Sequence, residues 1–136
     1  MAWIIDTCVL LDVALKSSKW GIASATLLDR KLDEGLHVTS ISVIEMAPLF
    51  NGDALAVLVF VSGIGASVES SWLDLDTRLA AKAWSAYVEA RRADRIGRRP
   101  IADIMIGAQA SRRGGLITRN TADFARWFPT LKIIAP

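Results

Sequence analysis

The sequence predicts an α/β protein with a mostly parallel sheet of about five strands and helices on both faces of the sheet. Short apolar segments with strand character alternate with longer segments of helical periodicity along the whole chain. Apolar residues make up 52% of the chain and the mean hydropathy is +0.35, as expected for a sheet buried on both faces. A chain of 136 residues is too short for two domains of ordinary size, so we expect one domain over residues 1–136.

The first strand and the two helices after it are predicted from simple patterns. An apolar run, Ala2 to Ile5, predicts a strand that stops at Asp6, and the residues that follow favour a helix over about 8–15. Apolar residues at helical spacing predict a second helix over about 22–34, which Gly35 ends. The carboxylate after the first strand has two interpretations: it caps the next helix, or it belongs to a ligand site at the carboxyl edge of the sheet.

The next segment combines a short strand with two helices. Residues 37–39 are predicted to form a strand. Ser42 is predicted to start a helix, because Ser42 and Glu45 form the Ser-x-x-Glu pattern of a capping box. An Asn-Gly-Asp turn at 51–53 precedes the apolar segment 54–62, which we expect to be a buried helix that ends at the glycines after it.

The C-terminal part continues the same alternation. Residues 68–73 are expected to form a strand, and 76–92 the longest helix, because its apolar residues recur on one face. Pro100 suits a first helical turn, so the next helix is expected over about 101–111, with Gly114 after its end. Three short elements complete the chain, namely a strand at 116–118, a helix at 121–127 and a strand at 132–135.

The composition excludes several classes of protein. Cys8 is the only cysteine and His37 the only histidine, which excludes intramolecular disulfides, Cys/His zinc sites and any Ser-His-Asp triad without His37. The longest apolar segment, 54–68, has 15 residues and two glycines, and is too short to span a membrane. The chain does not open on a secretory signal pattern, so we expect a cytoplasmic protein.

The net charge of +2 is unevenly distributed along the chain. Between Arg78 and Arg126 lie 11 of the 16 basic residues and only four of the 14 acidic ones. The densest basic part holds five arginines in nine residues: Arg91, Arg92, Arg95, Arg98 and Arg99. Arginines at the end of a helix complement the helix dipole, but five in nine residues exceed that need. We therefore predict that this segment binds a phosphate backbone, which the family resemblance described below implies to be that of RNA.

Three acids, Asp6, Glu45 and Asp103, are each the only charged residue in a stretch of eleven or more. Such surroundings predict burial, and a buried carboxylate must be protonated, paired or bound to a metal. Asp123, like Asp6, follows a predicted strand, so all four acids can meet at the carboxyl edge of the sheet. Each could instead be an acid that stabilises the first turn of a helix. A shared hard cation, Mg²⁺ or Mn²⁺, explains why they would converge.

Four motifs, in this order, resemble those of the PIN-domain ribonucleases, most closely the VapC-type toxins of prokaryotic toxin-antitoxin pairs. They are D-T-C-V-L-L-D at 6–12, S-V-I-E at 42–45, I-A-D-I-M-I-G-A-Q-A at 101–110 and T-R-N-T-A-D-F at 118–124. The resemblance implies the PIN-like three-layer α/β/α fold, a single PIN domain and Mg²⁺-dependent endonucleolytic cleavage of RNA. It also implies a homodimer that a cognate antitoxin inhibits.

The resemblance assigns roles to individual residues. Its catalytic and metal-binding acids correspond to Asp6, Glu45, Asp103 and Asp123. Its supporting polar residues correspond to Thr7, Thr118 and Asn120, and Thr118 is expected to contact phosphate or water. Two positions depart from the family pattern: Cys8 replaces the usual Asn or Ser, and Gly107 replaces a typical Ala, which allows a close approach to that helix.

Metal-assisted hydrolysis of RNA is the main functional hypothesis, and three alternatives stand beside it. The first is a PIN-like module that binds RNA or a protein without catalysis. The second is an aspartyl-phosphate protein, although Asp-x-Asp does not follow the first strand. The third is a nucleotide-binding domain, although Gly63-Ile-Gly65 lacks the third glycine. We also expect most of the five tryptophans in the core, and an apolar surface patch that a partner covers.

Overall fold

The computed structural model describes residues 2–94 and 100–136 and contains a five-stranded parallel sheet. The strand order is β3-β2-β1-β4-β5, and each neighbouring pair is parallel. The strands are β1 (Ala2–Ile5), β2 (Leu36–Thr39), β3 (Ala66–Glu69), β4 (Gly114–Ile117) and β5 (Ile133–Ile134). The predicted α/β class with a parallel sheet of about five strands is therefore confirmed.

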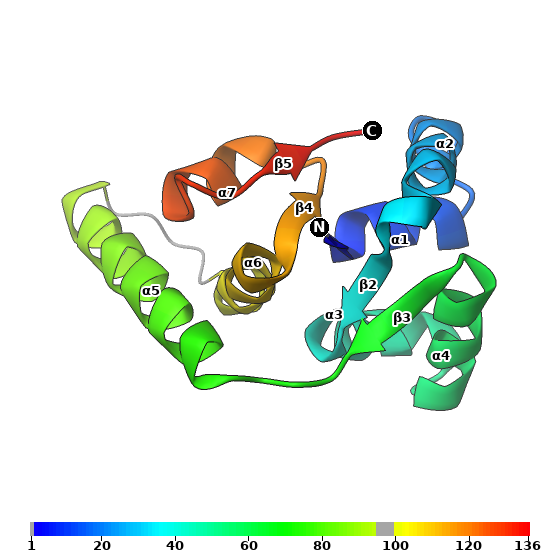
Figure 1. The fold of residues 1–136 in the computed structure, drawn as a ribbon, viewed down its shortest axis with the longest axis horizontal. Helices are drawn as coiled ribbons and strands as arrows, with labels where there is room; N and C mark the ends of the chain where they lie inside the picture. The colour runs from blue at the N-terminus through cyan, green and yellow to red at the C-terminus, as the bar shows by residue number, and fades with distance from the viewer. Residues whose placement is uncertain (1, 95–99) are drawn as a thin grey trace.

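Helices cover both faces of the sheet, which gives the predicted three layers (Figure 1). Alternate residues of β1 serve the two faces: Trp3 and Ile5 belong to one apolar core and Ile4 to the other. The first core is completed by α1 (Thr7–Ala14), α2 (Gly21–Lys31), α3 (Ser40–Met46) and α4 (Ala54–Gly63), and the second by α5 (Asp74–Asp94), α6 (Ile101–Arg113) and α7 (Thr121–Trp127). Two short 3₁₀ helices, η1 (Leu32–Glu34) and η2 (Ala47–Phe50), follow α2 and α3.

The strand order puts a topological switch point between β1 and β4. The chain runs from β1 to β2 and β3 on one side, and then crosses to β4 and β5 on the other side of β1. Asp6 follows β1 and Thr118 follows β4, so both lie at the carboxyl edge where the order reverses. Ligands of parallel α/β sheets bind in the crevice at this point.

The helix α3 begins directly after a cap that the sequence did not suggest. Its N-cap is Thr39, whose hydroxyl accepts a hydrogen bond from the Ser42 backbone N–H at 3.1 Å. The predicted capping box with Ser42 as the cap and Glu45 as its partner is therefore wrong. Because α3 starts directly after β2 ends, Ser42 lies inside the first turn and the Glu45 carboxylate is directed to another contact, described below.

The strand β3 covers Ala66–Glu69 and not the predicted 68–73. It is an edge strand that pairs only with β2, from Leu36 opposite Ala66 to Thr39 opposite Glu69. Pairing therefore ends where β2 ends, and the apolar residues after Glu69 lead into α5 without forming a strand.

The surface carries apolar side chains on α3 and α4, so the prediction that α4 is buried is wrong. Val57 and Val61 of α4 are buried, whereas Leu55 and Val59 are 72% and 73% exposed. Ile44 of α3 is 71% exposed. No single helix in the described ranges is long and apolar enough to cross a membrane, although α3 with η2 and α4, bent by 110°, pass that test as a pair.

The tryptophans only partly follow the prediction that most of them lie in the core. Trp3 is fully buried, whereas Trp72 is 40% exposed. Trp84 and Trp127 pack against the second core from partly buried positions, on either side of Tyr87. Their rings therefore join α5 and α7 near the surface, where they pack without being enclosed.

Candidate active site

One pocket, of about 380 Å³, is lined by all four of the predicted acidic residues. They come from the end of β1, from α3, and from the first turns of α6 and α7. The remaining lining residues include two of the three predicted supporting residues. The complete lining is Asp6, Thr7, Cys8, Leu11, Glu45, Asp103, Asn120 and Asp123. The fold thus brings together residues that are up to 117 positions apart in the sequence.

Asp6 is held in one orientation by three neutral donors. It is 5% exposed and is the N-cap of α1, and its Oδ1 accepts the Thr7 backbone N–H at 2.8 Å. Its Oδ2 accepts the Thr118 hydroxyl at 2.7 Å and the Cys8 thiol at 3.3 Å. The two interpretations of Asp6 from the sequence are therefore compatible, because the same carboxylate caps α1 and lines the pocket. Its predicted burial is confirmed.

The Thr7 hydroxyl connects Glu45 to the start of α1. It lies 2.7 Å from Glu45 Oε1 and 2.9 Å from Ser42 Oγ. A carboxylate only accepts hydrogen bonds, so Thr7 donates to Glu45. Glu45 is exposed, and its predicted burial is wrong, because Val43 and Met46 turn to the core while Glu45 itself lines the pocket.

Asp103 and Asp123 each occupy the first turn of a helix, α6 and α7 respectively. Carboxylates there are stabilised by the helix dipole, so a structural role is compatible with each position. Asp103 is partly buried and Asp123 is exposed. The residues of α6 from Ile106 to Ala110 are buried, as its apolar sequence predicted, whereas Ile101 is 50% exposed.

Thr118 and Asn120 shape the turn between β4 and α7. Thr118 is fully buried, and its hydroxyl accepts the Asn120 backbone N–H at 2.9 Å while it donates to Asp6. Asn120 is the N-cap residue of α7 and lines the pocket. Thr118 therefore lies behind Asp6 and supports it, and direct contact of Thr118 with phosphate or water stays a prediction.

Cys8 lines the pocket as a neutral thiol. Burial, together with the negative charge of Asp6, raises the pKa of Cys8 to about 11. At neutral pH the thiolate is then a very small fraction of the population, so Cys8 is poorly suited to act as a nucleophile. The carboxylates remain the reactive groups of this pocket.

Asp12 and Arg119 form an ion pair beside the pocket that the sequence did not reveal. Arg119 Nε and Nη2 lie 2.8 Å and 3.0 Å from the two carboxylate oxygens of Asp12, and the Ser24 hydroxyl donates to Asp12 at 2.8 Å. Both residues fall inside the motifs quoted above, which was the only available signal. Their separation of 107 positions hides the pair from a reading of local patterns.

The predicted RNA-binding arginines lie only partly within the described residues. Arg91 and Arg92 are in the last turn of α5, where Arg91 is partly buried and Arg92 exposed. Arg95, Arg98 and Arg99 lie outside the described residues.

The pocket suits a hard divalent cation by the type of its donors. Carboxylate oxygens are the ligands that Mg²⁺ and Mn²⁺ prefer, and Mg²⁺ usually keeps several waters. Within residues 2–94 and 100–136, no three Asp, Glu, His or Cys side chains lie close enough to form a ready metal-binding group. The pocket thus matches a hydrated ion, whose waters bridge separated carboxylates, better than a closed cage of direct ligands.

The sequence profile of the PIN domain matches residues 3–127. The chain belongs to the PIN domain family. This confirms the resemblance that the four motifs indicated. PIN domains are generally nucleases, and PIN nucleases generally use divalent metal ions. No match was found among curated proteins.

Several solved structures share the fold of this PIN domain. VapBC-1 from nontypeable Haemophilus influenzae has a TM-score of 0.70 and 16% identity, with 99% of this chain and 98% of that chain covered. VapBC2 from Rickettsia felis, bound to a promoter DNA fragment, has a TM-score of 0.68, 13% identity and the same coverage. FitAcB from Neisseria gonorrhoeae has a TM-score of 0.60 and 20% identity, with 97% and 96% covered.

Proposed function

We propose that this PIN domain, over residues 1–136, is a Mg²⁺-dependent endoribonuclease that acts in the cytoplasm as the toxin of a toxin-antitoxin pair. The observation that carries the proposal is the convergence of Asp6, Glu45, Asp103 and Asp123 on one pocket at the switch point of the sheet. Helix-capping or first-turn roles explain Asp6, Asp103 and Asp123 separately, but they do not explain Glu45 near the end of α3 and give no reason for the four to share a pocket. Membership of the PIN family supports the same reading.

A bound Mg²⁺, or Mn²⁺, would activate water and stabilise the leaving oxygen during phosphodiester hydrolysis. Asp6, Asp103 and Glu45 would hold the ion directly or through water, and Asp123 would complete the site. The chain itself fixes the direction of two of these carboxylates: Thr118 and the Thr7 amide orient Asp6, and the Thr7 hydroxyl orients Glu45. These donors are neutral, so the carboxylates keep their negative charge for the cation.

An RNA cleavage assay with mapped ends, run with Mg²⁺ and with EDTA, tests the proposal. Cleavage should require the divalent ion, and Asp6→Asn and Asp103→Asn should each lower the rate by at least about 100-fold, because the metal site loses a charged ligand. Asp33→Asn is the matched control, since Asp33 is an exposed acid of η1 outside the pocket, and it should leave the rate unchanged. Metal-independent cleavage, or full activity of either pocket variant, would refute the assignment.

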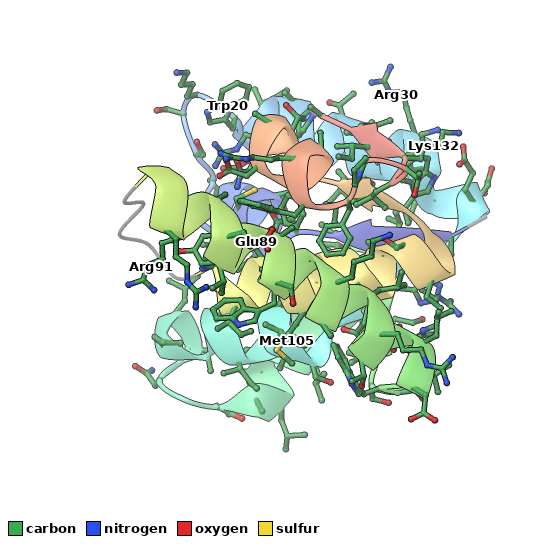
Figure 2. All side chains as sticks on the ribbon, turned by 90° about the vertical axis from the view of Figure 1, so that its left-hand side faces the viewer. Trp20, Arg30, Glu89, Arg91, Met105 and Lys132 are labelled. Carbon is green, nitrogen blue, oxygen red and sulfur yellow. The ribbon has the colours of Figure 1, made fainter. Side chains whose placement is uncertain are left out.

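The alternative is a module that binds RNA or a protein without catalysis. The same assay separates the two functions, because RNA binding without cleavage in Mg²⁺ or Mn²⁺ would favour the alternative. The basic segment serves either function. Figure 2 labels Arg91 near the C-terminal end of α5, the helix that faces the viewer. Replacing Arg91 and Arg92 by Ala should weaken RNA binding and reduce its salt dependence by a slope of about 1.4, at about 0.7 for each single-strand phosphate contact.

The apolar surface of α3 and α4 supports the proposal of protein partners, a second copy of this chain and an antitoxin. Ile44, Leu55 and Val59 are each more than 70% exposed. Exposed apolar residues on successive helices are typical of protein interfaces. Replacing Leu55 and Val59 by Glu should convert a homodimer to a monomer in light scattering. A wild-type chain that is monomeric at high concentration would refute the homodimer.

A further inference from the structure

The Asp12–Arg119 pair holds a permanent positive charge beside the acidic pocket. Asp12 is a buried residue of α1, one turn after Cys8, and its carboxylate receives two guanidinium hydrogen bonds and the Ser24 hydroxyl. The guanidinium also lies 5.2 Å from the centre of the Trp20 ring. Bidentate pairing and ring contact fix the direction of the Arg119 side chain, and Arg119 is not among the residues that line the pocket.

The backbone of Arg119 nevertheless belongs to the pocket wall. Its sequence neighbours are Thr118, which donates to Asp6, and Asn120, which lines the pocket. Its own backbone N–H donates to the Cys8 sulfur, and the charges of Asp6 and Asp12 both act on its guanidinium. A long cationic side chain therefore starts at the pocket and is directed to Asp12.

We propose that Asp12 is a positioning residue, which keeps the Arg119 guanidinium out of the acidic pocket and so leaves the pocket carboxylates available to a divalent cation. The inference rests on the proposed metal-dependent function. Asp12 offers Arg119 a bidentate carboxylate, which is the partner that a guanidinium prefers. When Asp12 carries no charge, the carboxylates that remain near the Arg119 guanidinium are those of the pocket. A guanidinium bound to them would compete with the metal ion.

Binding of Mn²⁺ to the full chain, followed by the EPR signal of the free ion, separates this role from a structural one. Asp12→Asn and Arg119→Gln break the same ion pair, so a purely structural role predicts equal losses of affinity. The positioning role predicts opposite results. Asp12→Asn should bind Mn²⁺ on the order of tenfold more weakly, because a released cation enters the pocket, whereas Arg119→Gln should bind as tightly as the wild type or more tightly.

The double variant Asp12→Asn/Arg119→Gln provides the decisive comparison. Because it lacks the competing cation, its Mn²⁺ affinity should return to within about twofold of the wild type, although it lacks the ion pair as well. Asp76→Asn is the matched control: it removes the carboxylate partner of Arg112, a buried pair whose members do not line the pocket, and should leave Mn²⁺ binding unchanged. Urea unfolding verifies that each variant is folded.

Several outcomes overturn the inference. Equal weakening in Asp12→Asn and Arg119→Gln, wild-type affinity in Asp12→Asn, or no recovery in the double variant would each do so. If Asp12→Asn does not fold, Arg119→Gln decides alone, since weaker binding than the wild type contradicts the positioning role and equal or tighter binding supports it. If the wild type binds no Mn²⁺, or Asp103→Asn binds it as tightly, then the proposed metal site fails and the inference falls with it.

Discussion

Replacing Thr118 by Val tests whether the hydroxyl behind Asp6 stabilises the site as the structure indicates. Thr118 is fully buried, and Val has nearly the same shape. The change removes the 2.7 Å hydrogen bond to Asp6 and the acceptor of the Asn120 N–H. A hydrogen bond to a charged group contributes about 1.5–3 kcal/mol, and an unpaired buried N–H costs about 1–3 kcal/mol. We therefore expect a loss of about 3 kcal/mol, which lowers the Tm by roughly 10 °C.

The comparison with Thr118→Ser isolates the hydroxyl from the methyl group. Ser keeps both hydrogen bonds and loses one buried methyl, at a cost of about 1 kcal/mol. Urea unfolding, followed by tryptophan fluorescence at pH 7, measures both variants, which should differ by about 2 kcal/mol in favour of Ser. If the Val variant is as stable as the Ser variant, the hydroxyl contributes nothing to the support of Asp6, and the reasoning about this contact is wrong.

Three further predictions follow from other contacts. Gly107→Ala should lower the stability by about 1–3 kcal/mol in thermal unfolding, because the added Cβ would lie 2.2–2.8 Å from Phe128 ring atoms. This loss should occur although Ala has the better helix propensity, and unchanged stability would contradict the packing of Phe128 on Gly107. Burial, and then the charge of Arg113, lower the pKa of His37. Neutral His37 therefore contributes fully to the free energy of unfolding above about pH 6.5, and this contribution is lost as the pH falls through the pKa of the folded state. In urea unfolding, the wild type should lose more stability than His37→Gln between pH 7.5 and 5, and parallel losses would refute this prediction. Labelling of Cys8 by iodoacetamide at pH 8 should be roughly 100-fold slower than that of a free thiol, since its pKa is about 11, and rapid labelling would show that the thiol is not shielded.

The order of strands and helices could be predicted because it depends on local patterns. An apolar run that stops at Asp6, and a glycine or proline at several changes of pattern, such as Gly35 and Pro100, define elements without reference to distant parts of the chain. Boundaries that depend on pairing could not be predicted. The edge strand ends at Glu69 because β2 ends opposite it at Thr39, and the sequence around Glu69 does not indicate where the strand ends.

The acids of the candidate site could be predicted, but not their surroundings. Asp6 lies in an apolar stretch that is buried on all sides, so its low exposure followed from its neighbours. Glu45 lies in a similar stretch, but α3 has an exposed face, and Ile44 beside it is 71% exposed. Apolar neighbours therefore indicate burial in a central strand more reliably than in a short helix at the edge of a core. The Arg119–Asp12 pair depends on the packing of α1 beside the turn after β4, which no local pattern records.

The chain stabilises its acidic groups in two different ways, and the difference distinguishes acids with a structural role from an acid that can bind a ligand. Asp76 and Asp12 each receive a guanidinium, from Arg112 at 2.7 Å and from Arg119 at 2.8 Å, and such pairs neutralise the charge where it is buried. Asp6 instead receives hydrogen bonds from an amide, a hydroxyl and a thiol, which fix its direction and carry no charge of their own. A protein that needed only stability at Asp6 would gain more from a cation, and Arg119 begins one residue away from the hydroxyl that holds Asp6. That this guanidinium is bound to Asp12 is the strongest structural argument that the charge of Asp6 is kept for a ligand.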